Sequence, residues 1–488
     1  MSKKLLALLL TLLMLVAVVP AVAQTTSQPF SITVFHTNDV HANANPSPGM
    51  GYAMMAAYVE QGKKEADHVL LFDAGDTFHG TVFATAVEGA SIAQVLNNVG
   101  YTAMTPGNHD FNYGYDRLKE LEESLVFPLV NCNIYLKDGT PAFTPYTIVE
   151  VEEKKIGVIG VATAEMVPKI HPDRIKDLDF RDGVEAVTAV VEQIKDETDA
   201  IILLSHWGIT GEETTSEVLG EIEGIDLIID GHSHDAWPEG HKTQGPLIVS
   251  AGEKLSHLGK AVLTFGEEGV VEVEASLLPS PTIFEDRAVI GLLNEITAQQ
   301  DILLNEVIGK TAVLLDGERA NARTKETNLG DLAADAFIAF TDADVAITNG
   351  GGIRASIEIG DITLRDTVTV FPFGNLIVTK EVKGADIRAA LEHGLRMYPD
   401  QNGGFPQIGG MTVSFDPAKE EGSRVVEVLV GSAPLEDEKA YVLATNDFMA
   451  AGGDGYEMFM QYPIIKEFGG MDEAIKNYIA SLGEEVAI

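Results

Sequence analysis

Short apolar runs alternate with amphipathic stretches along most of the chain. In the first half, runs rich in Val, Ile and Leu predict strands at residues 32–35, 68–72, 156–161, 200–204 and 227–229. The spacing of apolar residues over 51–62 and 90–99 predicts helices between them. Strands that alternate with helices favour an α/β fold, in which ligands bind where the strands end.

The alternation of strands and helices is interrupted near residue 281 and begins again in the second half of the chain. Residues 285–307 contain no proline, and their apolar residues recur at three- and four-residue spacing, which predicts a helix that joins two domains. Further helices are predicted at 329–340 and 385–396, and strands at 345–348, 412–415, 425–430 and 441–445. The pattern therefore places one domain at 28–284 and a second at 308–488.

The first residues have the pattern of a targeting segment. Lys3 and Lys4 precede an apolar run at 5–19, and an A-x-A cleavage pattern follows at 21–23. Residues 1–23 are therefore predicted to be a signal peptide, and the protein is expected to be secreted, to the periplasm or fully outside the cell. An uncleaved membrane anchor is the alternative. No other apolar stretch approaches spanning length, so stable membrane insertion after cleavage is not expected.

The net charge and the cysteine content limit the partners and the covalent links that the protein can have. The 488 residues carry a formal net charge of -41, which argues against a nucleic-acid polymer as partner. An anionic small substrate then needs local cations, from metals, arginines or lysines. The single cysteine, Cys132, has no intramolecular partner and lies in a strand-like run, where a buried small hydrophobic role is expected.

Polar clusters follow five of the apolar runs directly. They are Thr-Asn-Asp-Val-His at 37–41, Asp-Ala-Gly-Asp at 73–76, Gly-Asn-His-Asp at 107–110, Ser-His-Trp-Gly at 205–208 and Gly-His-Ser-His at 231–234. One such cluster alone is more typical of a surface loop, but five in order predict a metal site. Asp39 and His41 are two residues apart and can reach one ion, and Asp76 offers two oxygens that can bridge two ions. Two cations close together neutralise a phosphate ester, and mixed Asp, Asn and His donors suit Zn, Mn, Fe or Co.

The order of these clusters resembles the calcineurin-like metallophosphoesterase superfamily and, within it, the secreted 5'-nucleotidase and UDP-sugar hydrolase family. The resemblance implies an N-terminal four-layer α/β/β/α metallophosphoesterase domain and a smaller α/β C-terminal nucleotide-binding domain, joined by a helix. It also implies seven metal ligands in two overlapping groups. One metal would be held by Asp39, His41, Asp76 and His234, and the other by Asp76, Asn108, His206 and His232.

The same resemblance implies the catalytic residues. His109 would face the transferring phosphoryl group and assist the leaving group. Many family members have an Asp three residues after this His, whereas this chain has Asn112. An Asn can orient an imidazole but cannot stabilise imidazolium as a carboxylate does. Asp110 is adjacent and is expected to point elsewhere.

Three loops of the second half carry candidate substrate contacts. The glycines at 350–352 expose backbone N–H groups, and Arg354 adds a fork of donors, which suits an anion, although a tight structural turn is the alternative. Phe373 and Phe448 lie on loops, where they could sandwich a base or fill the core. Asp454 lies among glycines and could accept hydrogen bonds from ribose hydroxyls.

The resemblance assigns a role to each of these positions. Phe373 and Phe448 would stack on the base, Asp454 would hold the ribose, Asn349 the base edge and Arg354 the phosphate. Lys325 falls where the family has a further phosphate-binding arginine. A lysine lacks bidentate geometry, so Arg323 is a candidate to compensate.

These features predict a secreted two-metal phosphohydrolase that dephosphorylates nucleotides by attack of a metal-bound hydroxide on phosphorus. Nucleoside monophosphates are the expected substrates, and UDP-sugars a further class. The family relation implies a cleft that closes by rotation of the two domains about the linker helix. Alternatives are a 2',3'-cyclic-nucleotide 2'-phosphodiesterase with 3'-nucleotidase activity, a sulfate-ester hydrolase of the same architecture, and a non-catalytic binding protein.

Overall fold

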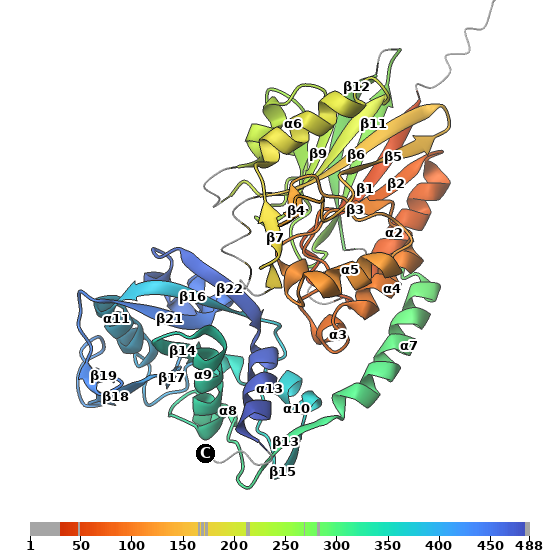
Figure 1. The fold of residues 1–488 in the computed structure, drawn as a ribbon. Helices are drawn as coiled ribbons and strands as arrows, with labels where there is room; N and C mark the ends of the chain where they lie inside the picture. Colours follow the sequence, from red (N-terminus) through yellow and green to blue (C-terminus); the bar gives the residue numbers. More distant parts are fainter. Residues whose placement is uncertain are drawn as a thin grey trace, which may run out of the picture.

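The computed structural model describes residues 30–483 except 47–48, 164–165, 167–169, 171–173, 211–214, 268 and 281–283. The predicted signal peptide, residues 1–23, lies outside the described residues. Figure 1 shows two bodies of mixed helix and strand connected by one long helix.

Two five-stranded sheets form the centre of the N-terminal body. The first has the order β12-β11-β1-β2-β3 and consists of β1 (Ser31–Thr37), β2 (Val69–Asp73), β3 (Ala103–Met104), β11 (His257–Phe265) and β12 (Val270–Pro279). The second has the order β10-β9-β8-β6-β5 and consists of β5 (Tyr146–Val151), β6 (Lys154–Ala162), β8 (Ala200–His206), β9 (Leu227–Asp230) and β10 (Leu247–Val249). Residues 257–279 form a hairpin that the sequence pattern did not single out.

Helices cover the outer faces of both sheets. On the first sheet these are α2 (Gly51–Glu65), α4 (Ala90–Val99) and α5 (Tyr115–Ser124), and on the second α6 (Gly183–Ile194). One apolar cluster joins the two sheets through residues such as Val34 and Leu204, and separate clusters lie beneath the helices on either side. The expected four-layer α/β/β/α arrangement is confirmed. Cys132 is buried in the cluster under α6, where burial raises the pKa of its thiol to about 12.

The linker helix α7 (Arg287–Leu304) begins at Asp286, whose carboxylate accepts from the N–H groups of Ala288 and Val289. The helix predicted at 285–307 overlaps α7, which starts two residues later and ends at Leu304, before β13 (Val307–Thr311) begins. Val289, Leu293 and Ile296 are buried in the core of the N-terminal body.

The C-terminal body is built on one sheet of order β17-β14-β21-β16-β22. Its strands are β14 (Val345–Asn349), β16 (Leu376–Lys383), β17 (Pro406–Gly409), β21 (Ala440–Asn446) and β22 (Ile464–Gly470). Helices α9 (Asn328–Thr341) and α13 (Met471–Leu482) pack on one face. Helix α11 (Gly384–Gly394) and the small sheet of β18 (Met411–Phe415), β19 (Val425–Val430) and β20 (Ala433–Pro434) pack on the other.

Strand direction brings the polar clusters together. β1 pairs in parallel with β2, and β6, β8 and β9 pair in parallel in the second sheet, so their carboxyl ends lie at one edge. β1 ends at Thr37, β2 at Asp73, β8 at His206 and β9 at Asp230, and four of the five clusters lie at these ends; the fifth, at 107–110, follows β3. Within the described ranges, no helix has the length and apolar character needed to cross a bilayer.

Candidate active site

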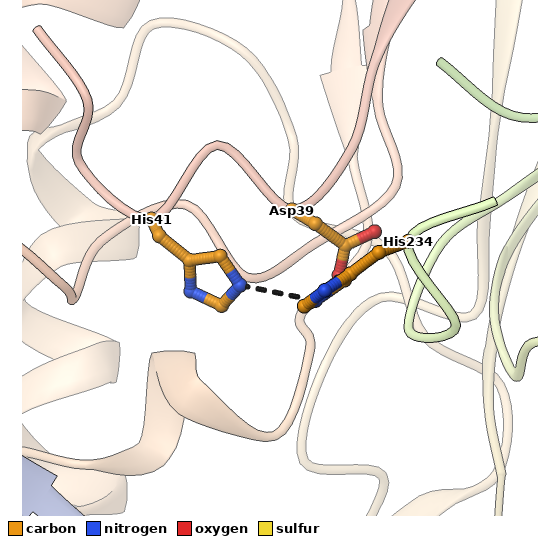
Figure 2. A group of neighbouring side chains, drawn as sticks. All are labelled: Asp39, His41 and His234. Carbon is orange, nitrogen blue, oxygen red and sulfur yellow. Dashed lines mark hydrogen bonds and ion pairs between the residues drawn. The ribbon is translucent and has the colours of Figure 1, made fainter. Parts of the chain in front are cut away.

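Two groups of metal-ligating side chains meet where the sheets of the N-terminal body end. In the first group, the ligand atoms of Asp39, His41 and His234 lie within 4.8 Å of one another (Figure 2). In the second, those of Asp76, His206 and His232 do the same. The structure therefore brings together six of the seven predicted ligands. The seventh, Asn108, places Oδ1 3.3 Å from Nε2 of His206, which adds it to the second group.

The distances between these donors fit cations. Nε2 of His41 lies 3.3 Å from Nε2 of His234, and Nδ1 of His232 lies 3.2 Å from Nε2 of His206. Nδ1 of His206 is 2.7 Å from the carbonyl oxygen of Ala74, and a proton there leaves Nε2 as the ligand atom. Ring nitrogens whose lone pairs converge are stabilised by a shared positive charge, so the donor set suits divalent ions such as Zn, Mn, Co or Fe.

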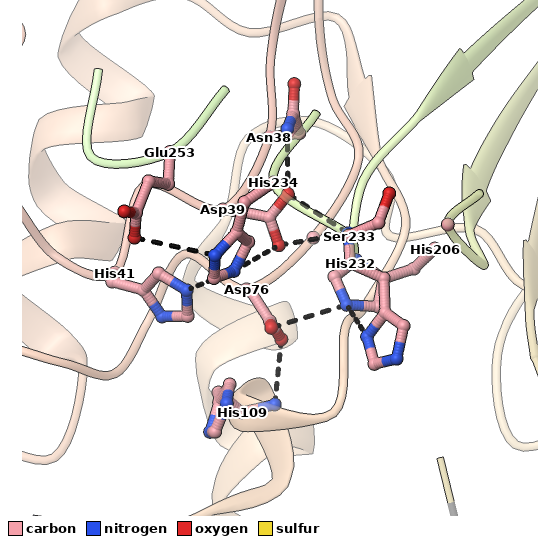
Figure 3. A network of polar contacts seen from close by, with 12 residues as sticks. Asn38, Asp39, His41, Asp76, His109, His206, His232, Ser233, His234 and Glu253 are labelled. Carbon is pink, nitrogen blue, oxygen red and sulfur yellow. Dashed lines mark hydrogen bonds and ion pairs between the residues drawn. The ribbon is translucent and has the colours of Figure 1, made fainter. Parts of the chain in front are cut away.

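Asp76 lies between the two groups (Figure 3). Its Oδ2 is 3.3 Å from Nε2 of His206, and its charge also acts on His41 in the first group. Oδ1 accepts a hydrogen bond from the backbone N–H of His109 at 2.7 Å. This position fits the bridging role predicted for Asp76.

The ligand loops hold an uncommon backbone conformation. Five predicted ligands have φ in the left-handed region: Asp39 at 50°, His41 at 47°, Asp76 at 58°, His232 at 76° and His234 at 56°. Non-glycine residues adopt this region at a cost, and such residues concentrate at functional sites.

A buried carboxylate holds two of these loops in place. Asp110 accepts hydrogen bonds from the backbone N–H groups of Gly107, Asp76, Thr77 and Phe78, at 2.8 to 2.9 Å. Both carboxylate oxygens of Asp110 are thus occupied by backbone N–H groups of the ligand loops. The sequence alone predicted no structural role for Asp110, although a buried carboxylate needs hydrogen-bond donors of this kind.

The metal-ligating histidines differ in protonation. Burial lowers the pKa of His41 well below its usual value, so its imidazole is neutral and ready to bind a metal. Burial also opposes the charge on His206, but the carboxylate of Asp76 outweighs it and raises the pKa to about 10. A cation that binds here replaces the proton on His206, so metal binding is coupled to proton release.

His109 is contacted from both domains. Its Nδ1 lies 3.2 Å from Nδ2 of Asn112, which is also 3.1 Å from Nδ1 of His79. Its Nε2 lies 3.1 Å from Oε2 of Glu467, on β22 of the C-terminal body. Burial lowers the pKa of His109, but Asp76 and Glu467 outweigh burial and raise the pKa to about 9. Sequence reasoning missed His79 and Glu467. Neither lies in a recognised motif, and Glu467 is more than 350 positions from His109.

The predicted nucleoside contacts form a second assembly in the C-terminal body. Asp454 accepts a hydrogen bond from Nδ2 of Asn349 at 2.8 Å, and Oδ1 of Asn349 accepts one from Asn446 at 2.9 Å. Phe373 and Phe448 are 57% and 46% exposed, so they line the surface rather than the core.

Arg323 lies near two other arginines and near Asp454. Partial burial and the charges of Arg319 and Arg354 lower the pKa of Arg323, and Asp454 acts in the opposite direction. Among the described residues, the buried Nε of Arg323 has no hydrogen-bond partner, which fits a site built for an anion. Lys325 instead lines a separate cavity with Leu391, Leu395 and Phe415 among others. Arg319 was missed, although its four-residue spacing from Arg323 over the short helix α8 (Arg319–Ala322) placed both on one side.

A cavity of about 540 Å³ separates the metal ligands from the C-terminal loops. His41, His109 and His234 line it from the N-terminal body, and Phe373, Gly374 and Glu467 line it from the other. The guanidinium carbon of Arg354 lies 5.4 Å from the centre of the Phe373 ring. Part of each candidate assembly therefore borders one cavity: His41 and His234 of the metal ligands, and Phe373 of the nucleoside contacts.

Comparison with known proteins decides the family. Residues 32–236 match the model of the calcineurin-like phosphoesterases, and residues 307–461 match that of the 5'-nucleotidase C-terminal domain. The 5'-nucleotidase of Bos taurus is 30% identical over 518 residues, which cover 93% of this chain and 89% of that protein. This chain belongs to the 5'-nucleotidase family.

Other relatives of this family member agree with the assignment. The trifunctional nucleotide phosphoesterase protein YfkN of Bacillus subtilis (strain 168) is 32% identical over 94% of the chain, which spans only 34% of that longer protein. The crystal structure of the 5'-nucleotidase precursor of Thermus thermophilus is 30% identical with a TM-score of 0.57, covering 94% of this chain and 97% of that one. The NAD nucleotidase of Haemophilus influenzae has a TM-score of 0.76 at 22% identity, covers 94% of this chain and 98% of that one, and supports the fold. As a family member, the protein is a metal-dependent phosphoric monoester hydrolase.

Proposed function

We propose that this enzyme hydrolyses nucleoside 5'-monophosphates to nucleoside and inorganic phosphate, with UDP-sugars as a further substrate class. The observation that carries the proposal is the shared cavity. It has His41 and His234 of the first metal-ligand group, together with His109, on one wall and the exposed Phe373 on the other, and Arg354 lies beside that ring. A nucleotide bound in this cavity would place its phosphate at the first wall and its nucleoside at the second. The relatives named 5'-nucleotidase support this substrate class.

Two divalent ions fit the donors of the N-terminal body. Asp39, His41 and His234 would hold one, Asn108, His206 and His232 the other, and Asp76 would bridge them. When bound, the ions neutralise phosphate charge and lower the pKa of an attacking water. The chain fixes its ligands in advance, since Asp110 anchors two ligand loops and Glu253 lies 3.5 Å from Nδ1 of His234. Adding back one metal at a time to the stripped protein identifies the two ions.

His109 is the proposed donor to the phosphoryl group or to the leaving oxygen. Asn112 orients its ring through Nδ1, which leaves Nε2 on the side of the cavity. Because Nε2 contacts Glu467 at 3.1 Å, a phosphoryl oxygen has to displace this carboxylate. Asn112 supplies orientation without negative charge, so the protonated form of His109 is stabilised by Asp76 and, until substrate displaces it, by Glu467.

The C-terminal loops are proposed to bind the nucleoside. Phe373 and Phe448 expose their rings for stacking on a base, and Asp454 offers a carboxylate to ribose hydroxyls. Arg354, together with Arg319 and Arg323, provides the positive charge that a strongly acidic protein needs locally to attract an anion. Asn349 holds Asp454, and the second amide hydrogen of its Nδ2 is available to a base edge. Lys325 stays a weaker candidate because it lines a different cavity.

The proposal also includes export. Residues 1–23 have the composition of a cleavable signal peptide, and the related Thermus thermophilus structure is described as a precursor. Expression of the full gene in a bacterial host, followed by N-terminal sequencing of the released protein, tests this. A first residue of Gln24 supports export, and an intact N-terminus in the cytoplasm contradicts it.

A substrate panel tests the activity. The purified protein is stripped of metal, supplied in turn with Mn, Co, Zn or Mg, and offered 5'-AMP, 3'-AMP, 2',3'-cyclic AMP, UDP-glucose and a thiosulfate ester. Hydrolysis of 5'-AMP to adenosine and phosphate with at least one metal, faster than hydrolysis of 3'-AMP or ring opening of the cyclic nucleotide, with products separated by chromatography, supports the proposal. Preference for 2',3'-cyclic AMP, or for the sulfur substrate, replaces it with one of the alternatives.

A further inference from the structure

Asp454 is held from two sides in a glycine-rich loop. The residue has φ 54° and ψ 15°, a left-handed conformation, and lies between Gly453 and Gly455. Its carboxylate accepts from Nδ2 of Asn349 at 2.8 Å. Its backbone carbonyl oxygen is contacted by Nε2 of His393 at 2.9 Å and by Nη2 of Arg396 at 3.3 Å.

The two residues that hold this carbonyl come from the C-terminal end of α11 and the turn after it. They are three positions apart, and Nη1 of Arg396 donates to the carbonyl oxygen of His393 at 2.8 Å. The His393 ring packs edge-on against Tyr456, with ring centres 5.1 Å apart, and Tyr456 is fully buried. The imidazole is therefore fixed in place before it meets the loop.

The ends of the loop are fixed separately. Lys380 is 4% exposed, and its amine donates to the carbonyl oxygens of Ala450 at 2.9 Å and Phe459 at 3.0 Å. Between these anchors lie three glycines, at 452, 453 and 455, whose backbone has wide conformational freedom. The contacts from His393 and Arg396 are made in the middle of this glycine-rich stretch, at Asp454 itself.

We infer that His393, assisted by Arg396, is a positioning residue that aims the Asp454 carboxylate at the ribose and so makes the enzyme selective for ribonucleosides over dideoxyribonucleosides. The inference rests on the proposed function, in which Asp454 accepts hydrogen bonds from ribose hydroxyls. A carboxylate discriminates a hydroxyl from a hydrogen only if it stays at bonding distance, and His393 fixes the peptide from which it projects.

Two substitutions of His393 separate positioning from packing. His393→Phe keeps a ring against Tyr456 but removes the N–H donor, whereas His393→Gln keeps a donor that can reach the Asp454 carbonyl. Binding of adenosine and of 2',3'-dideoxyadenosine is measured by calorimetry on each variant. The kcat/KM values for 5'-AMP and 2',3'-dideoxy-AMP are measured alongside, and thermal unfolding confirms that each variant is folded.

The wild type is expected to prefer the ribose form by about 10-fold to 100-fold, the range for hydrogen bonds to a charged group. His393→Phe is expected to lose about tenfold of that preference, His393→Gln to retain most of it, and Asp454→Ala to abolish it. Should His393→Phe fail to fold, Arg396→Met, which leaves His393 in place, is expected to reduce the preference about threefold.

Each outcome decides between the claims. Wild-type preference in the folded His393→Phe or Arg396→Met protein overturns the positioning role, and so does a wild type that binds both nucleosides equally. If the wild type prefers adenosine in binding but releases no phosphate from 5'-AMP, the proposed function fails while the positioning role stands.

Discussion

The contact between His109 and Glu467 leads to a prediction about substrate affinity. Nε2 of His109 and Oε2 of Glu467 are 3.1 Å apart, and their side chains are only 7% and 16% exposed. Solvent therefore screens this pair weakly. The carboxylate occupies the side of His109 from which a phosphoryl oxygen would approach, so an anionic substrate competes with it.

The size of the effect follows from the geometry. A hydrogen bond to a charged group contributes about 1.5–3 kcal/mol. At about 1.4 kcal/mol per factor of ten, the contact lowers apparent substrate affinity roughly 10-fold to 150-fold if it must break first. Glu467→Gln keeps the shape and removes the charge. Its KM for 5'-AMP is expected to fall about tenfold while kcat changes little.

Steady-state kinetics of 5'-AMP hydrolysis, with metal at saturation, measures this. The matched control is Glu473→Gln, which removes a second interdomain carboxylate that lies 3.8 Å from Arg174 and is not in contact with His109. The control is expected to leave KM within about twofold. A KM in Glu467→Gln that equals or exceeds the wild-type value refutes the competition, and equal decreases in both variants attribute the effect to a generally looser interface.

Four further predictions concern other parts of the molecule. Asp76→Asn is expected to lower bound divalent metal below two per chain and phosphate release by more than about 100-fold, since even outer partners of a metal site cost that much; full metal content by elemental analysis would contradict it. Arg323→Gln is expected to raise KM for 5'-AMP about tenfold and Lys325→Gln less than twofold, and the reverse order would restore Lys325 as the phosphate contact. Phe448→Leu is expected to weaken adenosine binding about tenfold in calorimetry. Burial lowers the pKa of His36 to about 3, against about 6.5 when unfolded, so the stability that neutral His36 contributes above pH 6.5 is lost as pH falls toward 3. In denaturant titrations at pH 7 and pH 4, His36→Leu is expected to lose about 3 kcal/mol less of its free energy of unfolding than the wild type does. An unchanged dependence of the free energy of unfolding on pH would show that His36 does not titrate on unfolding.

Sequence periodicity was sufficient for the parts of the fold with strong local signals. The helix over 90–99 and the strand over 425–430 have the predicted bounds, and the linker helix differs only at its ends. The hairpin of β11 and β12 was missed because its exposed face breaks the apolar run. Residues 274–276 alternate exposed and partly buried positions. Similarly, β22 carries Lys466 and Glu467, and such polar residues do not indicate a sheet strand.

The predicted metal ligands came from local motifs, and the parallel strands brought them to one edge. Contacts between segments far apart in the chain have no local motif that would predict them. Glu467 reaches His109 only because the two bodies meet, and neither spacing nor composition encodes that meeting. Lys325 was chosen by its place beside a motif, whereas Arg323 is the residue that lies near Asp454, with Arg319 one helical turn before it on α8. Local sequence pattern therefore indicated which kinds of residue form the sites, but not which distant residues their side chains contact.

The attachment of α7 determines where the two bodies can pivot. Its first turns are buried in the N-terminal core, and Nε2 of Gln300, only 5% exposed, donates to the carbonyl oxygen of Phe83 at 2.6 Å. Beyond that tether, Ile302 and Leu303 are 75% and 41% exposed. The start of the helix is thus fixed to the N-terminal body, whereas its end is tied to the C-terminal body: the guanidinium of Arg365 donates to the carbonyl oxygen of Asp301 at 3.2 Å and to Oδ1 of Asn305 at 3.3 Å. A swing of the C-terminal body therefore has to bend the helix between Gln300 and Asn305 or break these contacts.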